Sequence, residues 1–167
     1  MSQVDFAPIM TLEEFAQIRD DLEGTLILTS GGYDPLHPGH ISCIVDSKSH
    51  GDLLVVVVNG DWFLDRKKGK HFMDLKTRSE IVSAIRGVDF VVPFEIENDT
   101  TVSVALEAIA PDIFTKGGDR LDATTIPEWD TCVANGIEIV TGVGDSKTHS
   151  SSNILEDWYE HRLRLFM

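Results

Sequence analysis

The chain has 167 residues, of which 42% are hydrophobic, 28 are Asp or Glu and 14 are Lys or Arg, so its formal net charge is −14. This length suits a single domain with its own core, and the charge disfavours nucleic acids and anionic membranes as partners. No apolar run is long enough to cross a bilayer, and the first ten residues lack the features of a secretory signal. We therefore expect a cytoplasmic protein with one domain over residues 1–167.

The sequence predicts strands and helices in alternation after a lead-in over residues 1–10. In chain order they are helix 11–22, strand 25–30, helix 38–51, strand 53–58, helix 74–86, strand 88–92, helix 100–110, strand 112–115, helix 127–135, strand 137–141 and helix 150–165. Thr11 to Glu14 have the capping-box pattern, and the unbroken apolar run 53–58 is typical of a strand buried on both faces. This alternation predicts an α/β domain with a five-stranded parallel sheet, whose ligands bind beyond the carboxyl ends of the strands.

The loop after the first predicted strand carries the clearest functional pattern, Gly-Gly-Tyr-Asp-Pro-Leu-His-Pro-Gly-His over residues 31–40. Gly31 and Gly32 allow a tight turn and a close approach of the backbone to a ligand. His37 and His40 lie three residues apart at a helix start, so their imidazoles share one edge of that terminus. The same terminus offers unpaired N–H groups and a partial positive charge, which suit a phosphate.

Two other interpretations of the histidines remain open at this stage. They could be ordinary polar surface residues, or they could bind a metal ion together with Asp34. Gly39 favours the phosphate interpretation because it removes a side chain that would block the approach. The combination of the glycines, Asp34 and the strand–loop–helix context favours it as well.

Basic residues form a second group, which an acidic nucleotide-binding protein would need. A local cationic patch is predicted from four basic residues that stand close together in the sequence, Arg66, Lys67, Lys68 and Lys70. A solvated basic loop would have the same sequence pattern. Arg78, on the next predicted helix, could grip phosphate or could be an exposed ion-pairing residue.

Two further segments follow the later predicted strands. Lys116-Gly117-Gly118-Asp119 comes after the fourth strand and could hold a ligand or form a plain glycine turn. Ser150, Ser151 and Ser152 open the last helix, where their hydroxyl and N–H groups could hold phosphate, cap the helix, or do both.

The motif Gly-x-Tyr-Asp-x-x-His-x-Gly-His resembles the signature of the HxGH nucleotidyltransferase superfamily, which includes cytidylyltransferases and several adenylyltransferases. Segments 11–19, 59–61, 66–69, 111–119 and 150–154 are similar to its heptose 1-phosphate adenylyltransferase (ADP-heptose synthase) branch. The resemblance covers residues 11–155 and leaves 156–167 as an unmatched C-terminal helix extension. Tyr33 replaces the usual Phe. The stretch 145–149 lacks the arginine of cytidylyltransferases, with Lys147 as a substitute.

The resemblance implies a Rossmann-like sheet of strand order 3-2-1-4-5 with helices on both faces, so that the loops after strands one and four face each other. It implies transfer of an NMP group from an NTP to a phosphorylated small molecule, with ATP and a sugar 1-phosphate favoured. CTP with glycerol 3-phosphate or a similar alcohol phosphate is the alternative, and a non-catalytic nucleotide-binding module is a third. Family members are often dimers or larger, so a homodimer is also expected.

The resemblance also assigns roles within the site. Catalysis falls to His37, His40, Lys67 and Lys68. Nucleotide binding falls to Gly31, Gly32, Tyr33, Asp34, Gly39, Arg78, Lys116, Gly117, Gly118, Asp119, Ser150, Ser151 and Ser152. Asp61 and Trp62 are expected to contact the acceptor, unless Trp62 belongs to the core. Mg²⁺ is expected to bind through the nucleotide phosphates without a dedicated protein cage, and Asp34 to orient a histidine, the loop or the metal.

Overall fold

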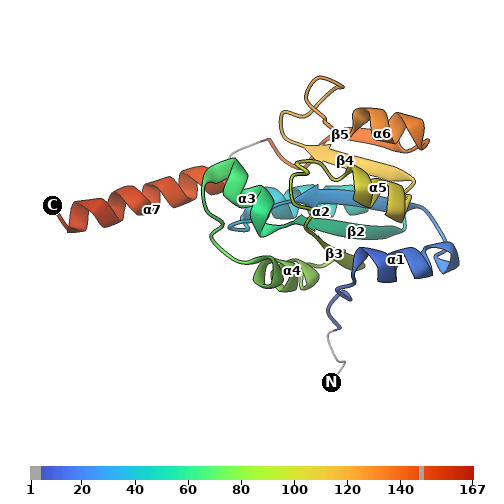
Figure 1. The fold of residues 1–167 in the computed structure, drawn as a ribbon, viewed down its shortest axis with the longest axis horizontal. Helices are drawn as coiled ribbons and strands as arrows, with labels where there is room; N and C mark the ends of the chain where they lie inside the picture. The colour runs from blue at the N-terminus through green and yellow to red at the C-terminus, as the bar shows by residue number, and fades with distance from the viewer. Residues whose placement is uncertain (1–4, 147–148) are drawn as a thin grey trace.

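Five parallel strands form one sheet in the computed structural model of the chain, which describes residues 5–146 and 149–167 (Figure 1). They are β1 (Leu26–Gly31), β2 (Leu53–Asn59), β3 (Phe90–Phe94), β4 (Ile113–Gly117) and β5 (Glu138–Val143). Their order is β3-β2-β1-β4-β5 and every neighbouring pair is parallel. The predicted strand order is therefore confirmed, and β1 and β4 meet where the order reverses.

Helices cover both faces of this sheet. They are α1 (Leu12–Ile18), continued by the 3₁₀ turn η1 (Arg19–Asp21), α2 (Pro38–Lys48), α3 (Asp61–Lys68), α4 (Leu75–Ser83), α5 (Ser103–Ile109), α6 (Trp129–Ala134) and α7 (Ser151–Leu165). The core that contains residues of α1, α5 and α6 lies on one face, and the core with residues of α2 and α4 lies on the other. Among the described residues, no helix is both long and apolar enough to span a membrane.

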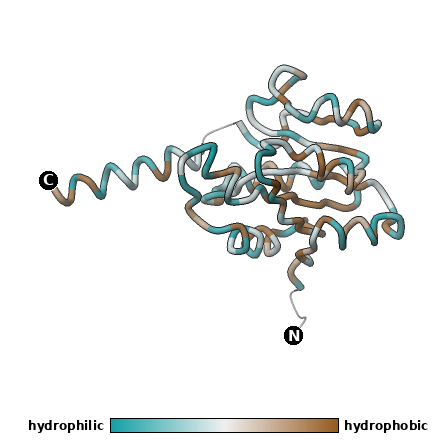
Figure 2. The backbone as a smooth tube through the Cα atoms, viewed as in Figure 1, coloured by the Kyte–Doolittle hydropathy of each residue, from teal (hydrophilic) through white to brown (hydrophobic). Residues whose placement is uncertain are grey.

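The run of apolar residues in β2 is buried on both faces, as predicted. Residues 54–58 are fully buried, and successive side chains of a strand point to opposite faces. Val55 and Val57 belong to one core cluster, whereas Leu54, Val56 and Val58 belong to the other. Figure 2 shows the resulting apolar centre of the molecule beneath more polar helices.

The helix caps follow the sequence, but one helix was not predicted. Thr11 and Glu14 exchange both hydrogen bonds of a capping box, and Asp74 accepts from the Thr77 N–H at 2.8 Å. The unpredicted helix is α3, although its basic last turn suits a helix C-terminus and Gly69 after it has a φ of 92°. The basic residues 66–68 therefore stand on a helix and not in a loop.

Helix α5 begins later than predicted because local side chains take its first N–H groups. Asp99 accepts hydrogen bonds from the N–H and hydroxyl groups of Thr101, which makes a turn there. The Val102 N–H donates to Glu128, a residue 26 positions away in the chain. The helix consequently starts at Ser103.

The packing of α1 gives a prediction for stability. Phe15 is fully buried and its ring meets the edge of Phe90 with the centroids 5.3 Å apart. We expect Phe15→Ala to lower the free energy of unfolding by about 3–5 kcal/mol, since it leaves a cavity in the core. Phe6→Ala is the matched control, because Phe6 is 68% exposed, and it should change stability by less than about 0.5 kcal/mol. Urea unfolding measures both, and equal losses would contradict the assigned core.

Candidate active site

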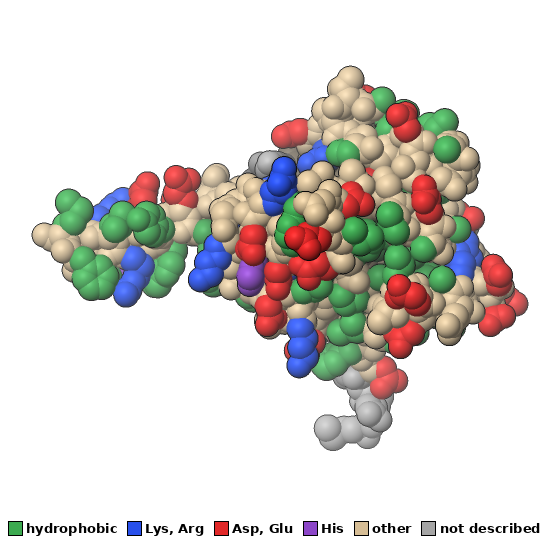
Figure 3. Space-filling view, in the orientation of Figure 1, with side chains coloured by type: hydrophobic (Ala, Val, Ile, Leu, Met, Phe, Trp, Pro, Cys, Tyr) green, Lys and Arg blue, Asp and Glu red, His purple; other side chains and the backbone are tan. Residues whose placement is uncertain are grey.

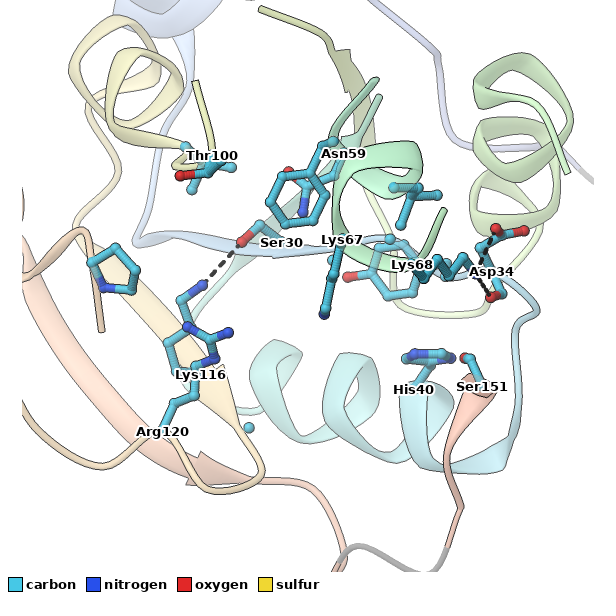
Figure 4. Close-up of a pocket in the computed structure, with 18 of the residues that line it drawn as sticks. Ser30, Asp34, His40, Asn59, Lys67, Lys68, Thr100, Lys116, Arg120 and Ser151 are labelled. Carbon is cyan, nitrogen blue, oxygen red and sulfur yellow. Dashed lines mark hydrogen bonds and ion pairs between the residues drawn. The ribbon is translucent and has the colours of Figure 1, made fainter. Parts of the chain in front are cut away.

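A cavity of about 610 Å³ opens at the carboxyl ends of β1, β2 and β4. Its walls come from the loop after β1, from α2 and α3, from the ends of β2 and β4, and from the first turn of α7 (Figure 4). The charged residues that line it are Arg66, Lys67, Lys68, Lys116 and Arg120, with Asp34 and Glu128. Five of the chain's 14 Lys and Arg residues thus stand in one cavity of a protein whose net charge is −14.

The two motif histidines stand at the amino-terminus of α2, where their rings stack with centroids 3.8 Å apart. His37 is the N-cap residue, and its Nδ1 accepts a hydrogen bond from the Gly39 N–H at 3.1 Å. The Nδ1 of His40 accepts from the His37 N–H at 3.2 Å. A neutral imidazole whose Nδ1 accepts a hydrogen bond carries its proton on Nε2, so each ring has an Nε2–H to donate.

Both rings are neutral at physiological pH. Burial lowers the pKa of His40 to about 4, and the neighbouring His37 ring and the charges of Lys67 and Lys68 act in the same direction. Burial and the neighbouring His149, whose ring centroid lies 5.8 Å away, also lower the pKa of His37. His40 lines the cavity, whereas His37 is not among the lining residues. The structure therefore offers one neutral imidazole donor to a ligand and places a second behind it in the stack.

Gly39 also has a packing role within the protein itself. A Cβ atom at this position would stand 2.9 Å from the His37 ring, closer than real Cβ contacts allow. The glycine therefore makes room for the N-cap imidazole, and the protein needs this space whether or not a ligand is bound.

Asp34 fastens the loop after β1 to the chain that follows α3. Its carboxylate accepts the N–H groups of Phe72 and Met73 at 2.7 Å each, and it pairs with the Lys68 Nζ at 2.8 Å. Burial opposes ionisation, but these three hydrogen bonds outweigh it and lower the pKa of Asp34. Of the expected roles, the structure assigns Asp34 to the loop and to Lys68, because its hydrogen bonds connect it to neither histidine.

All three basic residues of α3 line the cavity, whereas Lys70, beyond the end of the helix, does not. Lys68 is held by the Asp34 carboxylate and by the Asp34 carbonyl oxygen, at 2.8 and 2.6 Å. Figure 4 shows Lys67 pointing into the cavity from the same helix. The Arg66 guanidinium lies 5.6 Å from the centre of the Trp62 ring and also lines the cavity, whereas Lys70 is exposed and does not.

Lys116 enters the cavity from the end of β4, opposite His40 (Figure 4). Its Nζ donates to the Ser30 hydroxyl at 3.4 Å and lies 3.6 Å from the Glu128 Oε2. Burial lowers the pKa of Lys116, and the Glu128 charge opposes that shift. Glu128 is only 4% exposed, and its other oxygen accepts from the Val102 N–H. Within the described residues Oε2 makes no hydrogen bond, so its contact with Lys116 is an ion pair.

The first turn of α7 serves as a helix cap and as part of the cavity wall. Ser150 is the N-cap residue, and its side chain accepts from the Asn153 N–H at 3.4 Å. Ser151 and Ser152 line the cavity, and the Ser151 hydroxyl donates to the Pro35 carbonyl at 2.9 Å. The capping and ligand-binding interpretations of the serine run are therefore compatible.

Arg78 is not available to phosphate, which corrects the role expected for it. It is fully buried, and its guanidinium donates to the carbonyl oxygens of Met73, Gly32 and Asn59. Its Nη2 also pairs with the Asp61 carboxylate at 2.6 Å. Arg78 therefore braces the backbone behind the cavity, because it is fully buried and its Nε, Nη1 and Nη2 atoms all donate within the protein.

Other predicted residues lie outside the cavity. Neither Asp61 nor Trp62 lines the cavity, although the acceptor prediction required it, and the Asp61 carboxylate is paired with Arg78. Gly118 and Asp119 are exposed and are also absent from its lining, unlike Lys116 and Gly117 of the same motif. Lys147 lies outside the described residues.

Tertiary folding adds lining residues that the sequence analysis did not assign to the site. They are Ser30, Asn59, Phe63, Leu64, Thr100, Val102, Arg120, Pro127 and Glu128. Asn59 and Ser30 could have been found as polar residues at strand ends. Glu128 carried no such signal, because it stands alone beside Pro127, far along the chain from the histidine motif.

Comparisons with known sequences match this chain to one family and to a set of related proteins. A profile of the cytidylyltransferase-like family matches residues 28–156. The Bifunctional protein HldE of Nitrosococcus oceani is 37% identical over 117 residues, which are 69% of this chain and 24% of that protein. Its namesake from Coxiella burnetii is 35% identical over 134 residues, which are 79% of this chain and 27% of that protein. The chain thus spans about a quarter of the length of these relatives.

Solved structures share the fold. The lipopolysaccharide core biosynthesis protein from Thermoplasma volcanium is 29% identical, with a TM-score of 0.62 over 74% of this chain and 99% of that one. The pantoate-beta-alanine ligase from Francisella tularensis has a TM-score of 0.64 over 90% of this chain and 73% of that one. At 16% identity the ligase shows the fold alone, and the Rossmann-like prediction is confirmed.

The Asp34 contacts predict a pH-dependent loss of stability. Asp34→Asn keeps the shape but removes the charge that faces Lys68, so we expect it to cost about 3 kcal/mol at pH 7. Because the pKa of Asp34 is lowered on folding, its contribution is present above the ordinary aspartate pKa and is lost as the pH falls through the lowered value.

Urea unfolding at pH 7 and between pH 5 and 2 tests this prediction. The stability difference between wild type and Asp34→Asn should shrink in acid, and Asp119→Asn, at an exposed position, should match wild type throughout. A difference that stays constant down to pH 2 would show that the charge of Asp34 contributes nothing.

Proposed function

Because the chain belongs to the cytidylyltransferase-like family of nucleotidyltransferases, we propose that it transfers the AMP group of ATP to a sugar 1-phosphate and releases pyrophosphate. One observation carries the proposal: His40, Lys67, Lys68 and Lys116 line a single cavity together with the start of α7. The choice of ATP and a heptose-like sugar phosphate rests on the similarity of segment 111–119 to the heptose 1-phosphate adenylyltransferase branch, and the HldE relatives support it.

The triphosphate would lie against His40, the α3 lysines and two helix amino-termini. The amino-terminal ends of α2 and α7 carry the partial positive charge of a helix dipole, which favours anions. His40 would donate its Nε2–H to a phosphate oxygen without adding a positive charge of its own. Lys67 and Lys68 would neutralise the charge that grows on the departing pyrophosphate.

The acceptor phosphate would approach from the side of Lys116 and Arg120. An in-line displacement needs the attacking oxygen opposite the leaving group, and these two residues face His40 and Ser151 across the cavity (Figure 4). This assigns Lys116 to the acceptor and not to the nucleotide. The oxygen of the acceptor phosphate forms the new bond to the α-phosphorus, and the bond between the α-phosphorus and the bridging oxygen breaks, so that pyrophosphate keeps the electron pair.

The protein would act by position and charge and not through a covalent intermediate. A phosphate oxygen is already ionised at neutral pH, so no side chain has to remove a proton from it. Mg²⁺ would enter with the nucleotide and supply charge neutralisation at its phosphates. Within the described residues no group of three or more His, Cys, Asp or Glu could hold a metal ion, and Asp34 and Glu128 each face a lysine.

Substrate choice can be tested directly. We expect pyrophosphate release when the protein is incubated with Mg²⁺, ATP and a sugar 1-phosphate such as heptose or mannose 1-phosphate. CTP, GTP and UTP serve as controls for the base, and glycerol 3-phosphate for the acceptor. Release only with CTP and glycerol 3-phosphate would replace the proposal by the cytidylyltransferase alternative. Nucleotide binding without release in any combination would indicate a non-catalytic module.

Substitution of His40 tests the donor role. His40→Ala should lower kcat by about 10²–10³-fold, the usual cost of one well-placed donor. His40→Gln should recover part of that loss, because the glutamine amide can place an N–H near the Nε2 position. His50→Ala is the matched control, since this half-exposed histidine lies at the other end of α2, and it should leave kcat unchanged. Normal turnover of a folded His40→Ala variant would remove the imidazole from the mechanism.

A further inference from the structure

Glu128 is a buried carboxylate that the proposed mechanism does not use, although it lies beside a lysine that the mechanism needs. It is the N-cap residue of α6. Its Oε1 accepts the Val102 N–H at 3.1 Å, and its Oε2 lies 3.6 Å from the Lys116 Nζ. Within the described part of the chain, Oε2 has no hydrogen-bond partner. A buried carboxylate oxygen without a hydrogen bond is costly, so the charge of Lys116 must offset much of that cost.

Lys116 is held more loosely than Lys68, the other cavity lysine whose contacts are defined. The Lys68 Nζ lies 2.6 and 2.8 Å from two oxygens of Asp34. The Lys116 Nζ is 3.4 Å from the Ser30 hydroxyl and 3.6 Å from the nearest Glu128 oxygen. An ammonium group has three donors, and its hydrogen bonds to anions are normally about 2.7–2.9 Å long. Lys116 therefore keeps donor capacity for a phosphate, whereas Lys68 already makes two short contacts.

A ligand in the cavity would contact Lys116 and not the Glu128 Oε2 atom. This oxygen is buried, whereas the Lys116 side chain is 13% exposed and enters the cavity beside Arg120 (Figure 4). Direct contact between a carboxylate and a phosphate would also be repulsive. Glu128 would therefore act on a bound phosphate through Lys116.

The charge of Glu128 favours the cationic form of Lys116. Burial has the largest effect and lowers the pKa of Lys116, and Arg120, in the loop after β4, acts in the same direction. Glu128 and, to a smaller extent, Cys132 of α6 raise it. A neutral amine would not attract a phosphate into a chain of net charge −14, whose Asp and Glu side chains are spread over the body of the molecule (Figure 3).

We propose that Glu128 is a positioning residue of the acceptor site, which directs the ammonium group of Lys116 to the phosphate of the acceptor. This role rests on the proposed function, in which Lys116 binds the acceptor. The hydrogen bond from the Val102 N–H fixes the carboxylate, so that Oε2 stays beside Lys116. The Ser30 hydroxyl and Glu128 thus hold the lysine at the wall opposite His40 (Figure 4).

Glu128→Gln removes the charge with little change of shape. The amide oxygen can still accept the Val102 N–H, but the NH₂ group cannot pair with an ammonium. We expect KM for the sugar 1-phosphate to rise about tenfold or more, the usual cost of a hydrogen bond to a charged group, and KM for ATP to change by less than about twofold. Glu138→Gln, at an exposed position on β5, is the matched control and should leave both constants unchanged. A rise in both KM values, or in neither, would overturn the proposal.

Two further variants separate positioning from a general role in packing. If Glu128 acts through Lys116, Glu128→Gln should add little to the acceptor KM of a Lys116→Gln variant, because its target is already absent. Additive effects would contradict the proposal. Glu128→Asp keeps the charge but loses a methylene group, so it should impair the acceptor KM less than Glu128→Gln does. A larger effect of the aspartate would show that packing matters and the charge does not.

The protonation of Lys116 gives a readout that does not depend on turnover. Acetic anhydride reacts with neutral amines, so acetylation between about pH 7 and 11 reports the pKa of a lysine. Mass spectrometry can compare Lys116 with Lys76, whose side chain is 86% exposed. Because removal of the Glu128 charge lowers the pKa of Lys116 further, Glu128→Gln should shift its labelling curve to lower pH, and Glu138→Gln should not.

The labelling experiment also distinguishes this proposal from the proposed reaction. A Lys116 curve that Glu128→Gln leaves in place would overturn the positioning role, whatever the enzyme turns over. A shifted curve in a protein that turns over no substrate would support the coupling of Glu128 to Lys116 and contradict only the proposed reaction.

Discussion

The buried carboxylate of Asp34 is the constraint on which the cavity depends. It joins the loop after β1 to Lys68 at the end of α3 and to the backbone at Phe72 and Met73. From the other side, the buried guanidinium of Arg78 holds the carbonyl oxygens of Gly32 and Asn59. Burying either charge would be costly alone, and each is satisfied here by several hydrogen bonds. The loop that carries the histidines is thus held by two fully engaged charges.

The hydrogen-bond donors in the cavity are of two kinds, cationic lysine and arginine side chains and the neutral imidazole of His40. Lysines and arginines reach it from α3 and from the end of β4, while the imidazole of His40 stays neutral because burial and nearby lysines lower its pKa to about 4. A further charge on that ring would repel Lys67 and Lys68. At the opposite wall, the desolvation of Lys116 is offset in part by Glu128. The result is a field suited to phosphates inside a strongly acidic chain.

Helix α7 begins at the cavity and extends away from the body of the molecule. Its capped amino-terminus places Ser151 and Ser152 on the cavity wall, and its remaining turns project from the body and carry exposed hydrophobic side chains. One helix therefore contributes to the cavity at its first turn and stands exposed over the rest of its length.

Local patterns in the sequence determined the order of the strands and of every helix except α3, the capping box at Thr11, the two-sided burial of β2 and the placement of His37 and His40 at a helix start. Such features depend on periodicity and on neighbours a few residues away. Only the tertiary structure decided that Asp34 pairs with Lys68, that Arg78 is a brace and not a phosphate ligand, and that Glu128 stands beside Lys116. These partners lie between 12 and 46 positions apart in the chain, and their meeting depends on how the layers pack, which no local spacing encodes.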